Sequence, residues 1–190
     1  MRCPNSRDMA WSSESRKRAK RREAVGRLPI GGRLDLLRKG QLTVREIADF
    51  AADAGNDNYM EAEPEVNRLL DHEDPIVRYN AMATVAYEWG RSPRVDRICE
   101  ILLSDEDQDC RRQAAGALGS LFRGKRDKHV LNALVRTAKD ARESKDVRAF
   151  AYSSALDVIG VSRTIQPNPV DLHLGPNELL ALDEYLKALQ

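Results

Sequence analysis

Aromatic residues are scarce in this chain, at 5% of 190 residues, and the mixture of aromatic and β-branched residues that favours strands is sparse. No run approaches the roughly 18 uncharged apolar residues that span a bilayer, and the charged N-terminus lacks the apolar segment of a signal peptide. These absences argue against an all-β fold and predict a soluble, cytoplasmic protein. The length suits one domain or a short repeat array.

Cysteine is also rare, since the chain has only Cys3, Cys99 and Cys110. Their number and spacing match neither a disulfide scaffold nor a zinc motif, so we expect reduced thiols. Histidine pairs at metal-ligand spacing are absent too, because the three histidines stand far apart, at His72, His129 and His173.

The acidic string at 105–109 resembles the opening of a calcium loop. Such a loop needs glycine at its sixth position and glutamate at its twelfth, where this chain has Cys110 and Gly116. The sequence also lacks a G-x-S-x-G motif, a phosphate-binding glycine loop and a nucleophile with an obvious histidine base. We therefore predict no catalytic residues, no metal and no cofactor.

Charge is distributed unevenly along the chain. Residues 1–40 carry 12 Lys and Arg against 4 Asp and Glu, whereas residues 41–190 carry 19 against 26. We interpret residues 1–40 as a basic, mobile arm and linker, with glycine and proline between 26 and 32. A short helix capped at Ser12 or Ser13 should form fully only on a surface, and Met1 and Met9 are both candidate starts. The basic cluster comprises Arg16, Lys17, Arg18, Lys20, Arg21 and Arg22.

A repeated motif, V/C-R-x-x-A, organises residues 41–190. Its first residues are 33, 33 and 37 positions apart, and a helix start precedes each copy. Thr43 and Glu46 form a capping-box pattern before the first copy, and Pro75 suits a first helical turn. The copies begin at Val44, Val77, Cys110 and Val147 and place a small residue at Ala48, Ala81, Ala114 and Ala151.

Each motif helix is followed by a second, more amphipathic helix, so the unit is a helical hairpin. We predict second helices over about 63–71, 95–103 and 128–140, and a last pair over 145–159 and 178–189. Turns are expected at Gly55, Gly90 and Gly124. The stretch 160–175 is long for a hairpin turn and is either a functional insertion or a terminal irregularity.

The segment 72–81, HEDPIVRYNA, resembles the first helix of HEAT repeats, in particular the short bacterial form related to bilin-lyase-type repeats, which carries D-P-x-V-R-x-x-A. The other copies depart from this pattern, for example at Gln108, Cys110 and Lys145. The resemblance implies an all-α fold over 41–190, an α-solenoid of about four stacked antiparallel hairpins of HEAT or armadillo type. It says little about activity, because the motif residues are structural.

The repeated arginines, Arg45, Arg78, Arg111 and Arg148, are interpreted as an internal ladder that pairs with acidic residues at neighbouring helix starts and with turn carbonyls. Two enzyme groups resemble this architecture, the bilin lyases and the alkyl-purine DNA glycosylases. The latter use tryptophans beside an acidic residue, whereas Trp89, next to Glu88, is the only tryptophan after residue 40. We interpret Trp89 as a packing residue.

The leading hypothesis is a non-catalytic scaffold or adaptor that binds another protein through exposed second helices. The alternatives are nucleic-acid association through the basic cluster and an accessory role in an enzyme such as a bilin-lyase-like complex. The partner-binding candidates are Arg94, Arg97 and Glu100 in one hairpin and Lys128, Asn132, Arg136 and Lys139 in the next.

Overall fold

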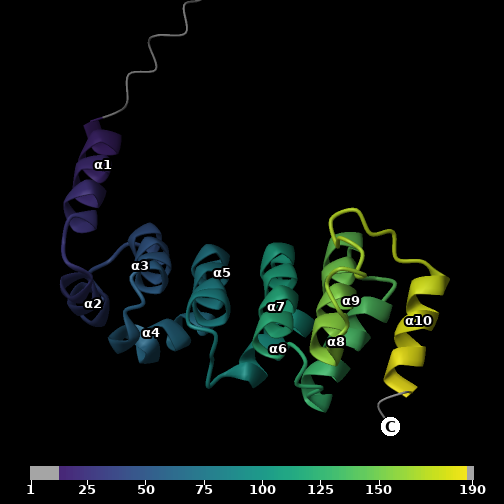
Figure 1. Cartoon of the computed structure of the whole chain (residues 1–190). Coiled ribbons are helices and arrows are strands. Elements are labelled where there is room, and N and C mark those ends of the chain that lie inside the picture. The colour runs from purple at the N-terminus through teal and green to yellow at the C-terminus, as the bar shows by residue number, and fades with distance from the viewer. Residues whose placement is uncertain (1–12, 188–190) are drawn as a thin grey trace, which may run out of the picture.

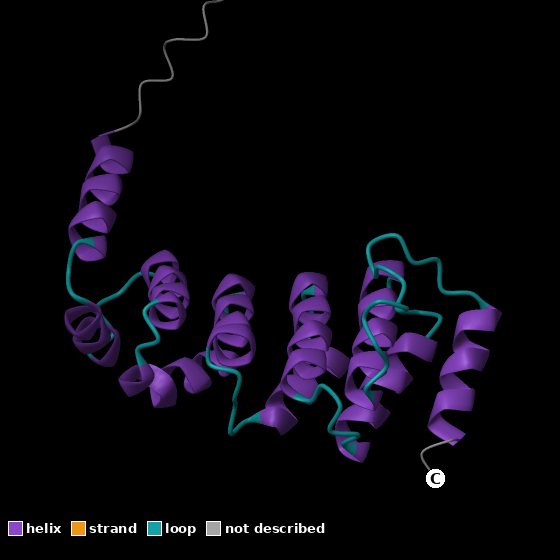
Figure 2. Cartoon of the chain, in the orientation of Figure 1, coloured by secondary structure: helices purple, strands orange, loops and turns teal. Residues whose placement is uncertain are grey.

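The computed structural model of the chain describes residues 13–187, and over this range the only regular secondary structure is helical (Figure 2). Cys3 and the alternative start at Met9 lie outside these residues. No helix between residues 13 and 187 has the length and apolar character needed to cross a membrane. The α-helices are α1 Ser13–Gly26, α2 Ile30–Arg38, α3 Val44–Asn56, α4 Glu63–Arg68, α5 Pro75–Ala83, α6 Val95–Ser104, α7 Gln108–Leu121, α8 Lys128–Lys139, α9 Lys145–Ile159 and α10 Pro176–Lys187.

The helices that carry the repeated motif, α3, α5, α7 and α9, lie side by side along the molecule (Figure 1). Each packs against the next, and α6 and α8 pack against α7 and α9 from one side. The predicted bounds of α9 are confirmed, and those of α6 and α8 differ from the prediction by one residue each.

The starts of α3, α5, α7, α8 and α9 are fixed by side-chain caps. The capping box at Thr43 and Glu46 is confirmed, because each side chain accepts a hydrogen bond from the other residue's backbone N–H. Asp74 caps α5 by accepting from Ile76 N, and Pro75 takes the first position of that helix, as predicted. The helices α7, α8 and α9 are capped in the same manner by Asp107, Asp127 and Ser144.

Neighbouring motif helices are joined by hydrogen bonds between residues 32 to 35 positions apart, close to the 33-residue spacing of the motif. In each bond a side chain donates to a backbone carbonyl of the preceding unit, so the polar contacts repeat along with the sequence. The pairs are Asn80 to Ala48 (3.0 Å), Thr84 to Ala51 (2.7 Å), Cys110 to Pro75 (3.2 Å) and Ser120 to Ala86 (3.4 Å).

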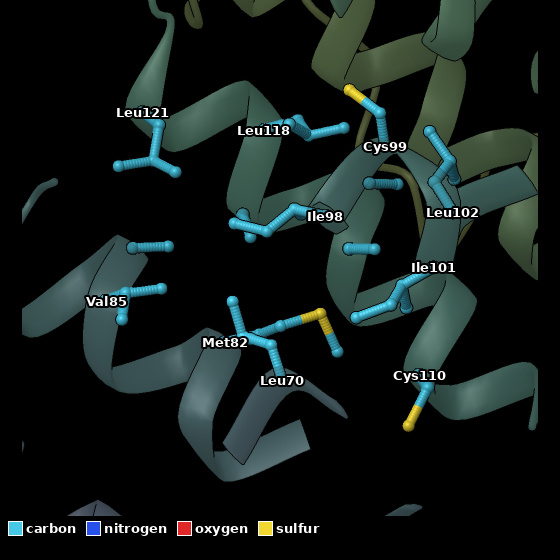
Figure 3. Packing of buried hydrophobic residues seen from close by; sticks show 14 of the residues in the cluster. Leu70, Met82, Val85, Ile98, Cys99, Ile101, Leu102, Cys110, Leu118 and Leu121 are labelled. Atoms are coloured by element: carbon cyan, nitrogen blue, oxygen red, sulfur yellow. The ribbon is translucent and has the colours of Figure 1, made fainter. Parts of the chain in front are cut away.

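The core is continuous through the row of helices. Figure 3 shows part of it, which combines Leu70 of the preceding hairpin, Met82 of α5, Ile98 and Ile101 of α6, and Leu118 of α7. Trp89 is partly buried against this core, in agreement with the packing role expected of it. The small residues of the motif, Ala48, Ala81, Ala114 and Ala151, are all buried in this core.

The structure differs from two local predictions, over 63–71 and at Gly55, and contains a π-helix that the sequence did not indicate. Residues 63–71 form the short α4 followed by a 3-10 helix, η2 Leu69–Asp71, because the final turn tightens, as helix ends often do. The end of α5 continues as a π-helix, η3 Thr84–Glu88. Gly55 lies within α3 and not in a turn; Asn58 takes the left-handed conformation there, with φ 49°.

The N-terminal part of the chain forms two helices. The α1 helix spans the basic cluster and projects away from the row at one end (Figure 1). The α2 helix packs on α3 and buries Leu34 together with the guanidinium-bearing side chain of Arg33, which bonds Asp53 at 2.5 Å.

Candidate functional site: the exposed face of the motif helices

The central arginines of the motif are structural, as predicted. Arg78 donates from Nε and Nη2 to the two carboxylate oxygens of Asp105, at 2.8 and 2.7 Å. Its Nη1 bonds the carbonyls of His72 and Glu73, both at 2.7 Å. The Arg78 and Asp105 side chains are only 7% and 4% exposed, so this bidentate pair is buried between two hairpins.

Arg111 repeats this arrangement one unit later. It donates to both oxygens of Glu143, at 2.7 and 3.0 Å, and to the carbonyls of Asp105 and Glu106. Burial alone would raise the pKa of Glu143, but bonds from Arg111 and from Ser144 N–H outweigh burial and lower that pKa below its ordinary value.

The outer two motif arginines do not complete the ladder. Arg45 is largely exposed and pairs with Asp49, one turn later in its own helix, at 3.3 Å. Arg148 bonds the carbonyl of Ala138 at 3.0 Å. The expected pairing with an acidic residue at a neighbouring helix start therefore holds for two of the four arginines.

Several predicted partner-binding residues are engaged within the molecule. Arg94 and Arg97 both pair with Asp71 at the end of the preceding hairpin, the second at 2.8 Å. Hydrogen bonds and attraction from Arg94 lower the pKa of Asp71 despite partial burial. Glu100 bonds Arg97 at 3.1 Å, and Lys139 pairs with Asp183 of α10. The remaining candidates are exposed on α8 and comprise Lys128, Asn132 and Arg136.

The opposite side of the hairpins displays aromatic rings and arginines, which the sequence reasoning missed. We call the exposed sides of α5, α7 and α9, with the adjoining π-helix η3, the motif-helix face. Tyr87, a large aromatic side chain, is 48% exposed there. Arg112 of α7 lies over the ring of Phe150 of α9, 5.6 Å from its centroid.

Two hollows indent the motif-helix face. One of about 400 Å³ lies between the beginnings of α5 and α7 and is lined by Tyr79 and Arg112, among others. The second, of about 300 Å³, lies between the ends of α7 and α9; we call it the loop pocket. Its lining includes Tyr87, Gly116, Ser120, Arg123, Asp157 and Arg163.

A periodic signal for this face was present in the sequence. Tyr79, Ala83 and Tyr87 recur every four residues, and Arg112, Gly116 and Ser120 do the same on α7. Each of these positions is one or two residues away from a position that faces the core. From the sequence alone they therefore look like ordinary surface positions of a helix. What the sequence could not show is that these sides of neighbouring helices adjoin.

The basic cluster lies on α1, and all six of its side chains are exposed. Two of them also contact α3: Arg21 bonds Glu46 at 3.3 Å and the carbonyl of Gln41 at 2.7 Å, while Arg22 bonds Asp49 at 2.7 Å. Part of the cluster thus rests against acidic residues of the helical row.

Cys99 and Cys110 are free thiols, as predicted, and both are buried. Burial raises the pKa of Cys99 to about 11 and that of Cys110 to about 12, so neither is a reactive thiolate at neutral pH. Between residues 13 and 187, no group of three or more His, Cys, Asp or Glu side chains is placed to hold a metal ion.

Comparison of the chain with protein-family models, with curated proteins and with solved structures gives no significant match.

Proposed function

We propose that the chain is a non-catalytic scaffold, an α-solenoid of HEAT-like hairpins, that binds another protein through its exposed helical surface. Two features support the solenoid: motif helices that pack in sequence order and side-chain bonds that recur at the spacing of the motif. Each hairpin contacts mainly its neighbours, which is how repeat proteins build extended binding surfaces.

The observation that carries the binding proposal is the composition of the motif-helix face. Exposed or half-buried tyrosine, phenylalanine and arginine side chains gather there, and these residue types are enriched at protein interfaces and their energetic centres. The two hollows lie between adjacent helices of the same face, where a partner side chain can be surrounded. We therefore propose this face as the main contact, with the second-helix candidates on α8 as the competing surface.

The test uses the full chain as bait in its native host, followed by affinity measurement with any purified partner. Tyr87→Ala with Arg112→Ala removes the ring and the cation from the motif-helix face. Asn132→Ala with Arg136→Ala makes a matched pair of changes on α8. We expect the first pair to weaken binding at least about tenfold and the second to leave it unchanged. The reverse result would assign binding to the second helices, and an enzyme as partner would indicate the accessory role.

The exposure of α1 supports a second candidate, contact with nucleic acid through the basic cluster. Lys17 and Lys20 have exposed ammonium groups, whereas Arg21 and Arg22 are already bonded to α3 and would have to leave it to reach phosphates. Affinity supplied by phosphate contacts is independent of sequence and falls steeply with salt.

Filter binding of mixed-sequence DNA and RNA at low and moderate salt tests this candidate. Neutralising the six residues of the basic cluster should abolish retention, and the wild-type log affinity should fall with log salt at a slope of several units. No retention at low salt would eliminate the candidate. Retention that persists without α1 would place the contact on the helical row instead.

A further inference from the structure

The segment 160–175, which joins α9 to α10, folds back over the end of α9 (Figure 1). Gly160 ends α9 in the left-handed conformation, with φ 96°. Gln166 then fixes the segment to the helix, because its Nε2 donates to Asp157 at 3.2 Å and to the carbonyl of Val161 at 2.8 Å. This attachment holds Arg163 beside Asp157, at one wall of the loop pocket.

Two arginines from different elements converge on one carboxylate in this pocket. Arg123, just after α7, donates to both oxygens of Asp157 at 3.0 and 3.2 Å. Arg163 reaches the same oxygens at 3.4 and 3.1 Å. Asp157 is buried, with its side chain 8% exposed, while the Arg123 and Arg163 side chains are 42% and 67% exposed. The buried carboxylate thus holds both arginines in place, while part of each arginine side chain stays exposed to solvent.

Both guanidinium groups keep donors that Asp157 does not use. A guanidinium has five N–H donors. In both Arg123 and Arg163, two guanidinium nitrogens donate to Asp157, and the guanidinium makes no other hydrogen bond within residues 13–187. Two positive charges face one negative charge, so the pocket retains a net charge of +1. It is therefore preorganised for one further acceptor of single negative charge.

This charge balance favours a carboxylate over a phosphate. A carboxylate accepts paired N–H donors from arginine and brings the pocket to neutrality. A phosphate dianion would make the net charge negative and would be repelled by Asp157 at short range. A volume of about 300 Å³ suits one side chain and lies at the lower limit for small-molecule sites.

The other walls give the pocket a shape suited to a side chain. The Tyr87 hydroxyl lies against Gly116, where a Cβ would be 2.5 Å from the phenolic oxygen, so glycine makes room for the ring. Ser120 and Ser153 add hydroxyl groups, and Phe150 adds an apolar surface. Tyr87 and Phe150 also belong to the motif-helix face, so a chain lying on that face passes directly over the pocket.

We propose that the loop pocket binds an aspartate or glutamate side chain of the partner protein, with Arg123 and Arg163 donating to its carboxylate. The assignment rests on the proposed binding function of the motif-helix face and identifies the chemistry of the partner: an extended segment that carries an acidic side chain. The segment 160–175 is then a functional insertion whose task is to present Arg163.

The test is an NMR titration of the full chain, observing the arginine Nε–Hε signals. The probes are N-acetyl-glutamate methylamide, its uncharged counterpart N-acetyl-glutamine methylamide, and inorganic phosphate. The glutamate probe should shift the Arg123 and Arg163 signals saturably, with affinity on the order of millimolar for so small a ligand. The glutamine probe should leave them in place, and phosphate should bind more weakly than the glutamate probe.

Variants then locate the site. Arg163→Gln and Arg123→Gln, each of which leaves Asp157 one arginine partner, should weaken binding of the glutamate probe at least about tenfold. Arg142→Gln is the matched control, because Arg142 is an exposed arginine that pairs with Asp140 in its own turn, and this variant should bind the glutamate probe as the wild type does. Thermal melts verify that each variant is folded. If a variant does not fold, the comparison of the three probes on the wild-type chain still tests the inference.

Equal binding of the glutamine probe, tighter binding of phosphate, or no saturable shift would each overturn the inference. Failure of the proposed function is a separate outcome. If the glutamate probe binds but Tyr87→Ala with Arg112→Ala leaves partner affinity unchanged, the motif-helix face is not the contact. If that double variant loses the partner but the glutamate probe does not bind, the motif-helix face is still the contact and the carboxylate pocket is rejected.

Discussion

A motif arginine makes a bidentate ion pair where the following unit supplies an acidic residue at the right place. Asp105 precedes α7 and accepts from Arg78, and Glu143 precedes α9 and accepts from Arg111. After the first unit, Asp71 pairs with Arg94, which precedes α6, and with Arg97 of α6, and Arg45 stays at the surface.

Removing Arg78 tests how much the ladder contributes to stability. Arg78→Ala leaves the Asp105 carboxylate buried without its partner, and breaking a buried pair in this manner costs about 3 to 5 kcal/mol. Arg45→Ala is the matched control at the same motif position, where the loss of an exposed pair should cost less than about 1 kcal/mol. Urea unfolding of both variants measures the difference, and equal losses would contradict a structural ladder.

Glu143 gives the ladder a pH dependence whose sign follows from its pKa. Because the folded-state pKa is lowered from the ordinary 4.5, the pair's contribution is complete above about pH 4.5 and is lost as the pH falls through the folded-state value. Glu143→Gln should therefore be less stable than the wild type at pH 7, and the gap should narrow at pH 3.5. Glu106→Gln, at an exposed neighbouring position, serves as the control. A gap that is constant with pH would refute the linkage.

At the scale of the element, α7 and α9 are in close contact at Gly119. A Cβ built there would lie 2.8 Å from Cβ of Ser154 and 3.0 Å from its backbone Cα, so the helices would have to separate. We expect Gly119→Ala to destabilise the fold by about 1 to 3 kcal/mol. Gly26→Ala, at the end of α1 with open space around it, should cause no loss, because alanine favours a helix more than glycine does. Denaturant unfolding distinguishes the two.

The elements predicted best from the sequence are those whose signals are local. The α9 helix was predicted with its observed bounds because its cap, Ser144, and its glycine end, Gly160, are both visible in the chain. Gly55 was misread because its role depends on a neighbour: a Cβ there would lie 2.8 Å from Glu88 Cγ, so glycine permits a close helix contact and not a turn. The π-helix η3 likewise has no local signal that we can identify.

At the scale of the molecule, the repeat indicated which helices follow one another but not which surface they expose together. The second-helix candidates are polar residues that the sequence pattern predicts to be exposed, yet Arg94 and Arg97 pair with Asp71. The loop pocket could not be predicted, since Arg123 and Arg163 meet only after the segment 160–175 folds back onto α9.

Truncation from the N-terminus tests where the stable unit begins. Deleting residues 1–27 removes α1, which buries no residue and contacts α3 through exposed arginines, so the cost should stay below about 1 kcal/mol. Deleting residues 1–40 also removes α2 and with it the buried Leu34, which adds about 1.5 to 3 kcal/mol. Both chains should retain a cooperative helical melt, because the continuous core from α3 onward is intact. Thermal and urea unfolding, followed by circular dichroism, measures each step. If the shorter chain lost its cooperative melt, α2 would be an essential first layer of the fold; if both deletions cost the same, the packing of Leu34 on α3 would contribute nothing.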